Sequence, residues 1–315
     1  MAVELPNPLI LQLDSKVSME LRLIPPGRFR MGSRNGFSSE QPVHKVEITR
    51  PFYMGKYPVL QSQWRALVDS LKECDLSPTL SRFEGDCHPV DQVGWNEVMR
   101  WCNLLWGNAL SSRLFDKVGN VVKLKDALLG LPCEAEWEYA CRAGTETDYH
   151  SGDGDAALLT AGWFSENSGN TTHPVGEKLA NNLGLYDMHG NVEEWCLDAW
   201  DKSAYRKRVN CVQDPVVKPT DLGYRDENVS RVLRGGSWFD FADRCHAAYR
   251  NGGRPSISLG FTGFRACLFL SPHHDEPVSK DLVRQQTETP LLGTGKDEEE
   301  VNLSKSHFPS WEQGD

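Results

Sequence analysis

The second half of the chain, from Gly144 to Cys267, shows almost no helical periodicity. Its short apolar pieces are separated by Gly, Asn, Asp and Ser, which are residues typical of turns. The whole chain contains 10 Trp and 27 Gly, so large aromatic side chains can fill the gaps between irregular segments. The pattern predicts a half made of turns and short strands around buried Trp and Tyr.

The first half carries more regular elements. Alternating apolar residues predict strands at 17–23, 29–31 and 43–48, and Pro25-Pro26-Gly27 suggests that the first two form a hairpin. Helical spacing predicts helices at 61–71, 96–106 and 132–143. Pro132 suits the first helical position, and Gly144 can close that helix in a left-handed conformation. The expected class is α+β with little regular secondary structure.

The composition changes near residue 271. Residues 271–315 contain ten acidic and four basic residues, a net charge of −6 out of −10 for the whole chain. Polar, Pro-containing sequence of this kind predicts a largely disordered tail. We therefore divide the chain into an N-terminal extension at 1–16, a folded domain at 17–270 and an acidic tail at 271–315.

Charge and cysteine content limit the partners and the compartment. A nearly neutral body with an acidic tail, and no basic cluster, argues against nucleic acid. No apolar run reaches the roughly 18 residues that span a bilayer, and no signal peptide precedes the domain, so a membrane is not expected. Nine Cys is an odd number without a secretory signal, which predicts reduced thiols and a cytoplasmic protein.

Common catalytic signatures are absent, including Walker A, the Rossmann glycines, HExxH, CxxC pairs and GxSxG. Instead, unusual segments follow one another in a fixed order. They read GRFRMG at 27–32, HPV at 88–90, LPCEAEWEYA at 131–140, GLYDM at 184–188, GNVEEW at 190–195, LRGGSW at 233–238 and GFR at 263–265.

This order resembles the formylglycine-generating-enzyme family, also called sulfatase-modifying factors, from about Val17 to Cys267. The resemblance implies a compact mixed fold related to C-type lectin domains. We interpret the remaining signature residues as structural. Glu134, Glu138 and Arg142 would be helix charges, Trp137, Trp195 and Trp238 would be core, and Arg265 would be the buried partner of a carboxylate or of carbonyl groups.

The best-known family members oxidise a peptide cysteine in a sulfatase to formylglycine with dioxygen and copper(I), held by two cysteines after a GGS segment. Here Cys245 matches the second cysteine and Asp240 stands at the first, with Ser237 as the serine. These three residues are the catalytic candidates. A carboxylate is a poor ligand for Cu(I), so copper is doubtful. Cys245 is then either a metal ligand or a small buried apolar residue. Cys267 would supply a second thiol only if the fold brings it near Cys245.

The resemblance implies a calcium site in the GLYDM and GNVEEW segments. Asp187 and Glu194 would give carboxylates, and Gly190 and Val192 would give carbonyl oxygens, which are ligands that calcium prefers. The alternative is that Asp187 and Glu194 hold only local hydrogen bonds.

Two functions from different classes follow. The first is a binding domain without oxidase activity, because Asp240 replaces a ligand cysteine. Its peptide, protein or small-molecule ligand would contact a recognition surface of aromatic and Arg side chains: Trp238, Phe239, Phe241, Tyr249 and Arg250. The second is an oxygen-dependent oxidoreductase that retains Cys245 as the reactive thiol and acts on a protein cysteine, with a sulfatase as the substrate.

Overall fold

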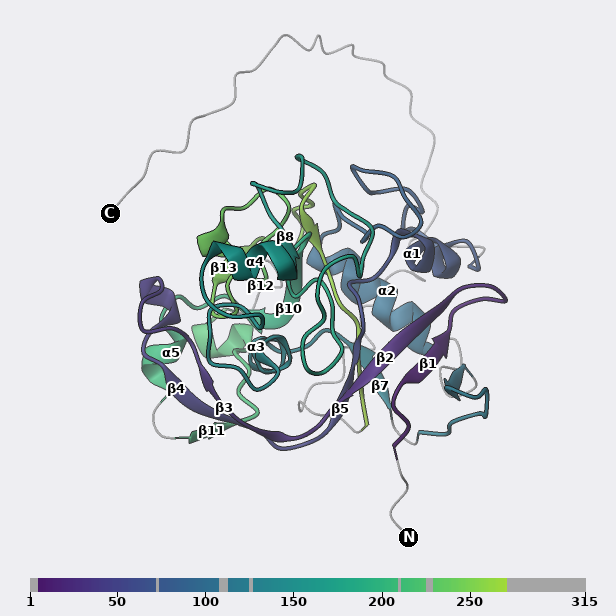
Figure 1. Ribbon diagram of the computed structural model, residues 1–315. Coiled ribbons are helices and arrows are strands. Elements are labelled where there is room, and N and C mark those ends of the chain that lie inside the picture. The colour runs from purple at the N-terminus through teal and green to yellow at the C-terminus, as the bar shows by residue number, and fades with distance from the viewer. Residues whose placement is uncertain are drawn as a thin grey trace, which may run out of the picture. The chain divides into compact units, whose positions relative to one another are not determined.

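The computed structural model describes residues 5–71, 74–107, 113–124, 127–208, 211–224 and 229–270. These residues belong to one compact unit, in which short strands and short helices are joined by long irregular segments (Figure 1). The α+β class is confirmed. The acidic tail at 271–315 lies outside the described residues, so its disorder stays a prediction.

The largest sheet has the strand order β6-β1-β2-β5-β15-β7, and all its neighbours are antiparallel. Its strands are β1 (Leu9–Gln12), β2 (Ser18–Ile24), β5 (Phe52–Gly55), β6 (Leu114–Asp116), β7 (Leu128–Gly130) and β15 (Cys267–Phe269). Leu9 and Leu11 of β1 are fully buried. Residues 9–12 of the segment that we expected to be an N-terminal extension are therefore part of this sheet, because their alternate apolar side chains face the core.

Three smaller sheets complete the described strands. One runs β13-β12-β10-β14, with β10 (Glu193–Ala199), β12 (Arg231–Arg234), β13 (Arg250–Gly253) and β14 (Thr262–Gly263). Another runs β11-β4-β3, with β3 (Gly27–Met31), β4 (His44–Ile48) and β11 (Cys211–Gln213). The last pairs β8 (Gly162–Trp163) with β9 (His189–Gly190).

The predicted opening hairpin is wrong. β2 pairs with β1 and β5, whereas β3 pairs with β4 in a different sheet. Pro25 and Pro26 lie between the two strands and have no backbone N–H to give to a ladder. This turn therefore carries the chain from one sheet to the next.

The three predicted helices are present with shifted ends. They are α1 (Gln61–Val68), α2 (Trp95–Gly107) and α3 (Glu134–Arg142), followed by α4 (Asp155–Ala161), α5 (Ala204–Lys207) and the 3-10 turns η1 (Ser38–Glu40), η3 (Pro219–Leu222) and η4 (Ala242–Arg244). Cys133 caps α3, and Ala143, with φ of 47°, closes it one residue before Gly144. No helix among the described residues has the length and apolar content to span a bilayer.

Helix α3 contacts strands of two sheets, namely β3 and β4 on one side and β10 and β12 on the other. Its acidic residues are therefore buried rather than solvated. Glu134 accepts two hydrogen bonds from Arg250, at 2.6 and 2.7 Å, and Glu138 pairs with Arg142 and Arg234. All five side chains are at most 5% exposed, so the helix charges are structural, as predicted, but they form an ion-pair network inside the core.

Candidate functional site

The loop that carries the catalytic candidates follows β12. Gly235 and Gly236 both have positive φ, at 95° and 65°. A Cβ atom on Gly236 would lie 2.5 Å from the Arg244 carbonyl oxygen and 2.7 Å from the Cys245 Sγ atom. Glycine is needed here because the loop folds back on itself. The fold back brings Ser237 and Cys245 to the same place.

Asp240 is bound within this loop. The Ser237 hydroxyl donates to Oδ2 of Asp240 over 2.5 Å, and Arg244 lies 3.6 Å from Oδ1. Burial is the main cause that raises the pKa of Asp240 above its ordinary value, against the Ser237 and Arg244 interactions, which lower it. The Ser237 hydroxyl and the Asp240 carboxylate are therefore hydrogen bonded to each other within the loop.

Cys245 is fully buried against Tyr149, Leu158 and Phe164. Burial raises the pKa of its thiol well above the ordinary value, and the nearby carboxylates of Asp240 and Glu193 raise it further. A protonated, buried thiol is a weak nucleophile. These features favour the apolar reading of Cys245.

Cys267 does not pack beside Cys245 in the fold. Cys267 lies on β15 and packs in a different hydrophobic cluster, with Trp137 and Met54, from the cluster that holds Cys245. All nine cysteines are free. Among the described residues, no group of three or more His, Cys, Asp or Glu side chains could hold a metal ion.

Glu193 is a residue that sequence reasoning missed. It is 2% exposed, and its carboxylate accepts hydrogen bonds from Asn251, at 3.0 and 3.4 Å. Burial first, and then the charge of Asp240, raise the pKa of Glu193 to about 8. Because side chains alternate along β10, Glu193 and Glu194 face opposite sides. The adjacent positions of the two acids in the sequence could therefore have predicted that they have different partners.

The predicted calcium residues come together in the turn around β9. Asp187 accepts hydrogen bonds from the Gly176 backbone N–H at 2.8 Å and from Asn191 at 3.2 Å. Glu194 is bound by Arg265, at 2.7 Å between Nη2 and Oε1, and by the Trp137 indole at 2.7 Å. The expected pairing of Arg265 with a carboxylate is thus confirmed.

This pairing bears on the calcium prediction. Arg265 places a fixed positive charge beside Glu194 and also donates to the Tyr186 carbonyl, at 2.8 Å. A calcium ion at Gly190 and Val192 would share Glu194 with that guanidinium. The local hydrogen-bonding alternative describes the observed contacts, and calcium stays a prediction.

The predicted ligand surface needs correction. Phe239 and Phe241 are 59% and 67% exposed, but Trp238 and Arg250 are both 3% exposed. Arg250 is held by Glu134 and the Ser39 carbonyl, because β13 lies beside the charged face of α3. Tyr249 is half-buried and meets Phe37 edge to face. Of the five predicted residues, Phe239 and Phe241 are the exposed ones, Tyr249 is partly accessible, and Trp238 and Arg250 are buried.

Other aromatic residues extend the exposed pair. Phe239 stacks on Phe261, with ring centroids 6.2 Å apart, and meets the Trp238 ring edge to face. Phe83 packs on the other side of Trp238, at 5.3 Å, and the Arg82 guanidinium lies 5.5 Å from the same ring. We call Arg82, Phe83, Phe239, Phe241 and Phe261 the aromatic surface. It was missed in part because residues 82–83 and 261 are distant in sequence from 239.

Comparisons with known proteins agree with this architecture. The chain is 30% identical over 270 residues to the formylglycine-generating enzyme of Mycobacterium tuberculosis, covering 72% of this chain and 89% of that one. It is 26% identical to the chaperone protein LppX of Paenibacillus barcinonensis, covering 75% and 84%. The solved structure of Treponema denticola variable protein 1 superposes with a TM-score of 0.63 at 25% identity, covering 82% and 97%.

The family model described as the sulfatase-modifying factor enzyme 1-like domain matches residues 12–268. This range spans all four sheets and includes the loop that carries Ser237, Asp240 and Cys245. The resemblance read from the motif series is therefore confirmed: the chain belongs to the sulfatase-modifying factor family, whose members include the formylglycine-generating enzymes.

Proposed function

We propose that this chain is a binding domain of the family in which the oxidising copper site is lost. The observation that supports this most is Asp240, which stands where the first cysteine is expected and is hydrogen bonded to Ser237. Beside it, Cys245 is a buried, neutral thiol. A copper(I) site needs accessible thiolates, and this loop offers neither a pair of thiols nor a thiolate.

The ligand would bind at the aromatic surface. Contiguous exposed apolar patches mark interaction sites, and Phe239, which is 59% exposed, stacks on Phe261 and meets Trp238, with Phe241 two residues further along the same loop. Arg82 adds a cation whose guanidinium lies over the rings of Phe83 and Trp238. Aromatic and Arg side chains are the groups that carry most binding energy in protein interfaces. We propose a peptide or protein as the ligand.

A selection experiment tests the binding proposal. Peptides would be selected from a displayed random library on the purified protein, and their affinities measured by calorimetry. Phe239→Ala should weaken binding about tenfold or more, whereas Tyr224→Ala removes an aromatic residue that is 55% exposed outside the aromatic surface and should change nothing. Equal affinities for the two variants would contradict the proposal.

The alternative is a formylglycine-generating oxidoreductase, and the relative named as such at 30% identity favours it. Its substrate would be a cysteine of a sulfatase peptide, oxidised by dioxygen. Incubation of the reduced protein with copper and such a peptide in air, followed by mass spectrometry, distinguishes the two. An unchanged peptide mass supports the binding domain, and conversion of the thiol to an aldehyde establishes the alternative. The cytoplasmic location stays a prediction.

A further inference from the structure

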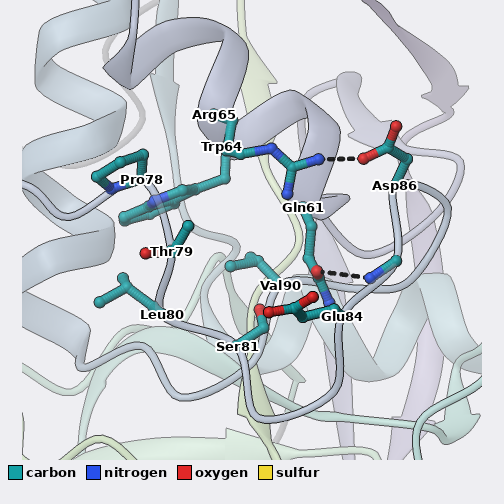
Figure 2. A pocket seen from close by; sticks show the side chains of 11 residues that line it. Gln61, Trp64, Arg65, Pro78, Thr79, Leu80, Ser81, Glu84, Asp86 and Val90 are labelled. Atoms are coloured by element: carbon teal, nitrogen blue, oxygen red, sulfur yellow. Dashed lines mark hydrogen bonds and ion pairs between the residues drawn. The ribbon is translucent and has the colours of Figure 1, made fainter.

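A cavity of about 450 Å³ lies between α1 and the loop at 77–90. Its size is within the range of sites that hold small ligands. In Figure 2, Trp64, Pro78 and Leu80 lie on one side of the cavity, and the Glu84 carboxylate lies beside Ser81 and Val90. The cavity therefore has an apolar side and an acidic group in the same space.

The walls of this cavity are fixed by hydrogen bonds. The Gln61 side-chain amide donates to the carbonyls of Phe83 and Pro89, at 2.6 and 3.2 Å, and accepts from the Gly85 N–H at 3.0 Å. The Trp64 indole donates to the Ser77 carbonyl at 2.9 Å. A ligand would enter a space that is already formed, so little ordering entropy would be lost on binding.

The residues that line the cavity include one basic side chain, Arg65, and two acidic side chains, Glu84 and Asp86. Arg65 is paired with Asp86, and Arg82, the basic residue nearest to Glu84 in sequence, lies over the Phe83 and Trp238 rings instead. Glu84 has no hydrogen-bond or ion-pair partner among the residues that the structure describes. Among the lining residues, Arg65 is paired with Asp86, so the charged group left without a partner is the Glu84 carboxylate.

We propose that this cavity binds a primary ammonium group attached to an apolar body. An ammonium has three N–H donors. Glu84 can accept one as a charged partner, and the hydroxyl oxygen of Ser81, which lies beside it in Figure 2, can accept another. The apolar body would lie against Pro78 and Leu80, because Trp64 and Val90 are each only 1% exposed and lie behind this wall. An anionic ligand would meet the Glu84 charge without a free cation to balance it.

The test uses benzylamine and its neutral counterpart benzyl alcohol as probes. Binding is followed by the ¹H and ¹⁵N shifts of the Trp64 indole N–H, assigned with Trp64→Phe. Benzylamine should shift this signal in a saturable way, and benzyl alcohol should bind about fivefold more weakly because it lacks the ion pair. Glu84→Gln should reduce benzylamine binding to the level of benzyl alcohol.

Glu146→Gln is the matched control, since Glu146 is also exposed and lies outside the cavity. It should leave the benzylamine affinity unchanged, and both variants should unfold at the wild-type temperature. The proposal is overturned if the two probes bind equally, if Glu84→Gln retains the wild-type benzylamine affinity, or if the Trp64 signal does not move.

Discussion

The ion-pair network on α3 and the loop from Ser237 to Cys245 both carry family motif residues, and they use them differently. In the network, Glu134, Glu138 and their three arginines pair with one another in the core. In the loop, the positions of the two cysteines expected from the family resemblance hold Asp240 and the buried Cys245. The motif residues of the network hold the fold together, whereas the loop is where we propose that the chemistry has changed.

The largest effect is expected in the network. Arg234→Ala removes the cation shared by Glu138 and Glu134 and leaves buried carboxylates with fewer partners. We expect a loss of about 3–5 kcal/mol in the free energy of unfolding, measured by urea denaturation. Arg28→Ala is the control, because Arg28 is 71% exposed in its pair with Glu47, and it should cost less than about 1 kcal/mol.

A second prediction concerns how the free energy of unfolding depends on pH through Glu193, which is buried near Asp240 of the loop. The folded-state pKa of Glu193 is raised from 4.5 to about 8. The folded protein keeps this proton while the unfolded chain loses it, so the stabilisation is fully present below pH 4.5 and is lost as the pH rises through about 8.

Glu193→Gln should remove this dependence. The difference in unfolding free energy between wild type and variant should fall by about 4 kcal/mol from pH 4.5 to 8.5, measured by urea denaturation at each pH. Glu146→Gln, which changes an exposed acid, should show no such trend. A pH-independent difference for Glu193→Gln would mean that Glu193 is ionised in the fold.

A smaller effect concerns the calcium prediction. Millimolar calcium added to chelator-treated protein should raise the melting temperature by about 2 °C if the ion binds the turn and shares Glu194 with Arg265. The measurement is differential scanning fluorimetry, with magnesium as the control ion. An unchanged melting temperature would show that Arg265 alone closes the turn.

The smallest effect is expected at the aromatic surface. Phe239→Ala should change the free energy of unfolding by less than about 0.5 kcal/mol, because the side chain is 59% exposed. Urea denaturation beside the binding measurement separates stability from recognition. A loss above about 2 kcal/mol would show that Phe239 is a packing residue rather than a ligand contact.

The sequence predicted the family, the class and the three main helices, because periodicity and motif order are local features. It did not predict which strands pair, since the turn at Pro25 and Pro26 leads equally to a hairpin or to a change of sheet. It also placed Arg250 at the surface, because nothing local indicates that β13 lies beside α3 and Glu134. The aromatic surface joins residues 82–83 with 239–261, a contact that only the fold creates.

The central claim is that the fold persists without the copper site, and Cu(I) titration of the reduced protein tests it most directly. Exposed Cys87 and Cys211 would first be changed to Ser, and the resulting protein compared with Cys245→Ala and Asp240→Cys in the same background. We predict that Cys245→Ala leaves copper binding unchanged and that Asp240→Cys strengthens it. Tight stoichiometric binding before either change, lost in Cys245→Ala, would contradict the account.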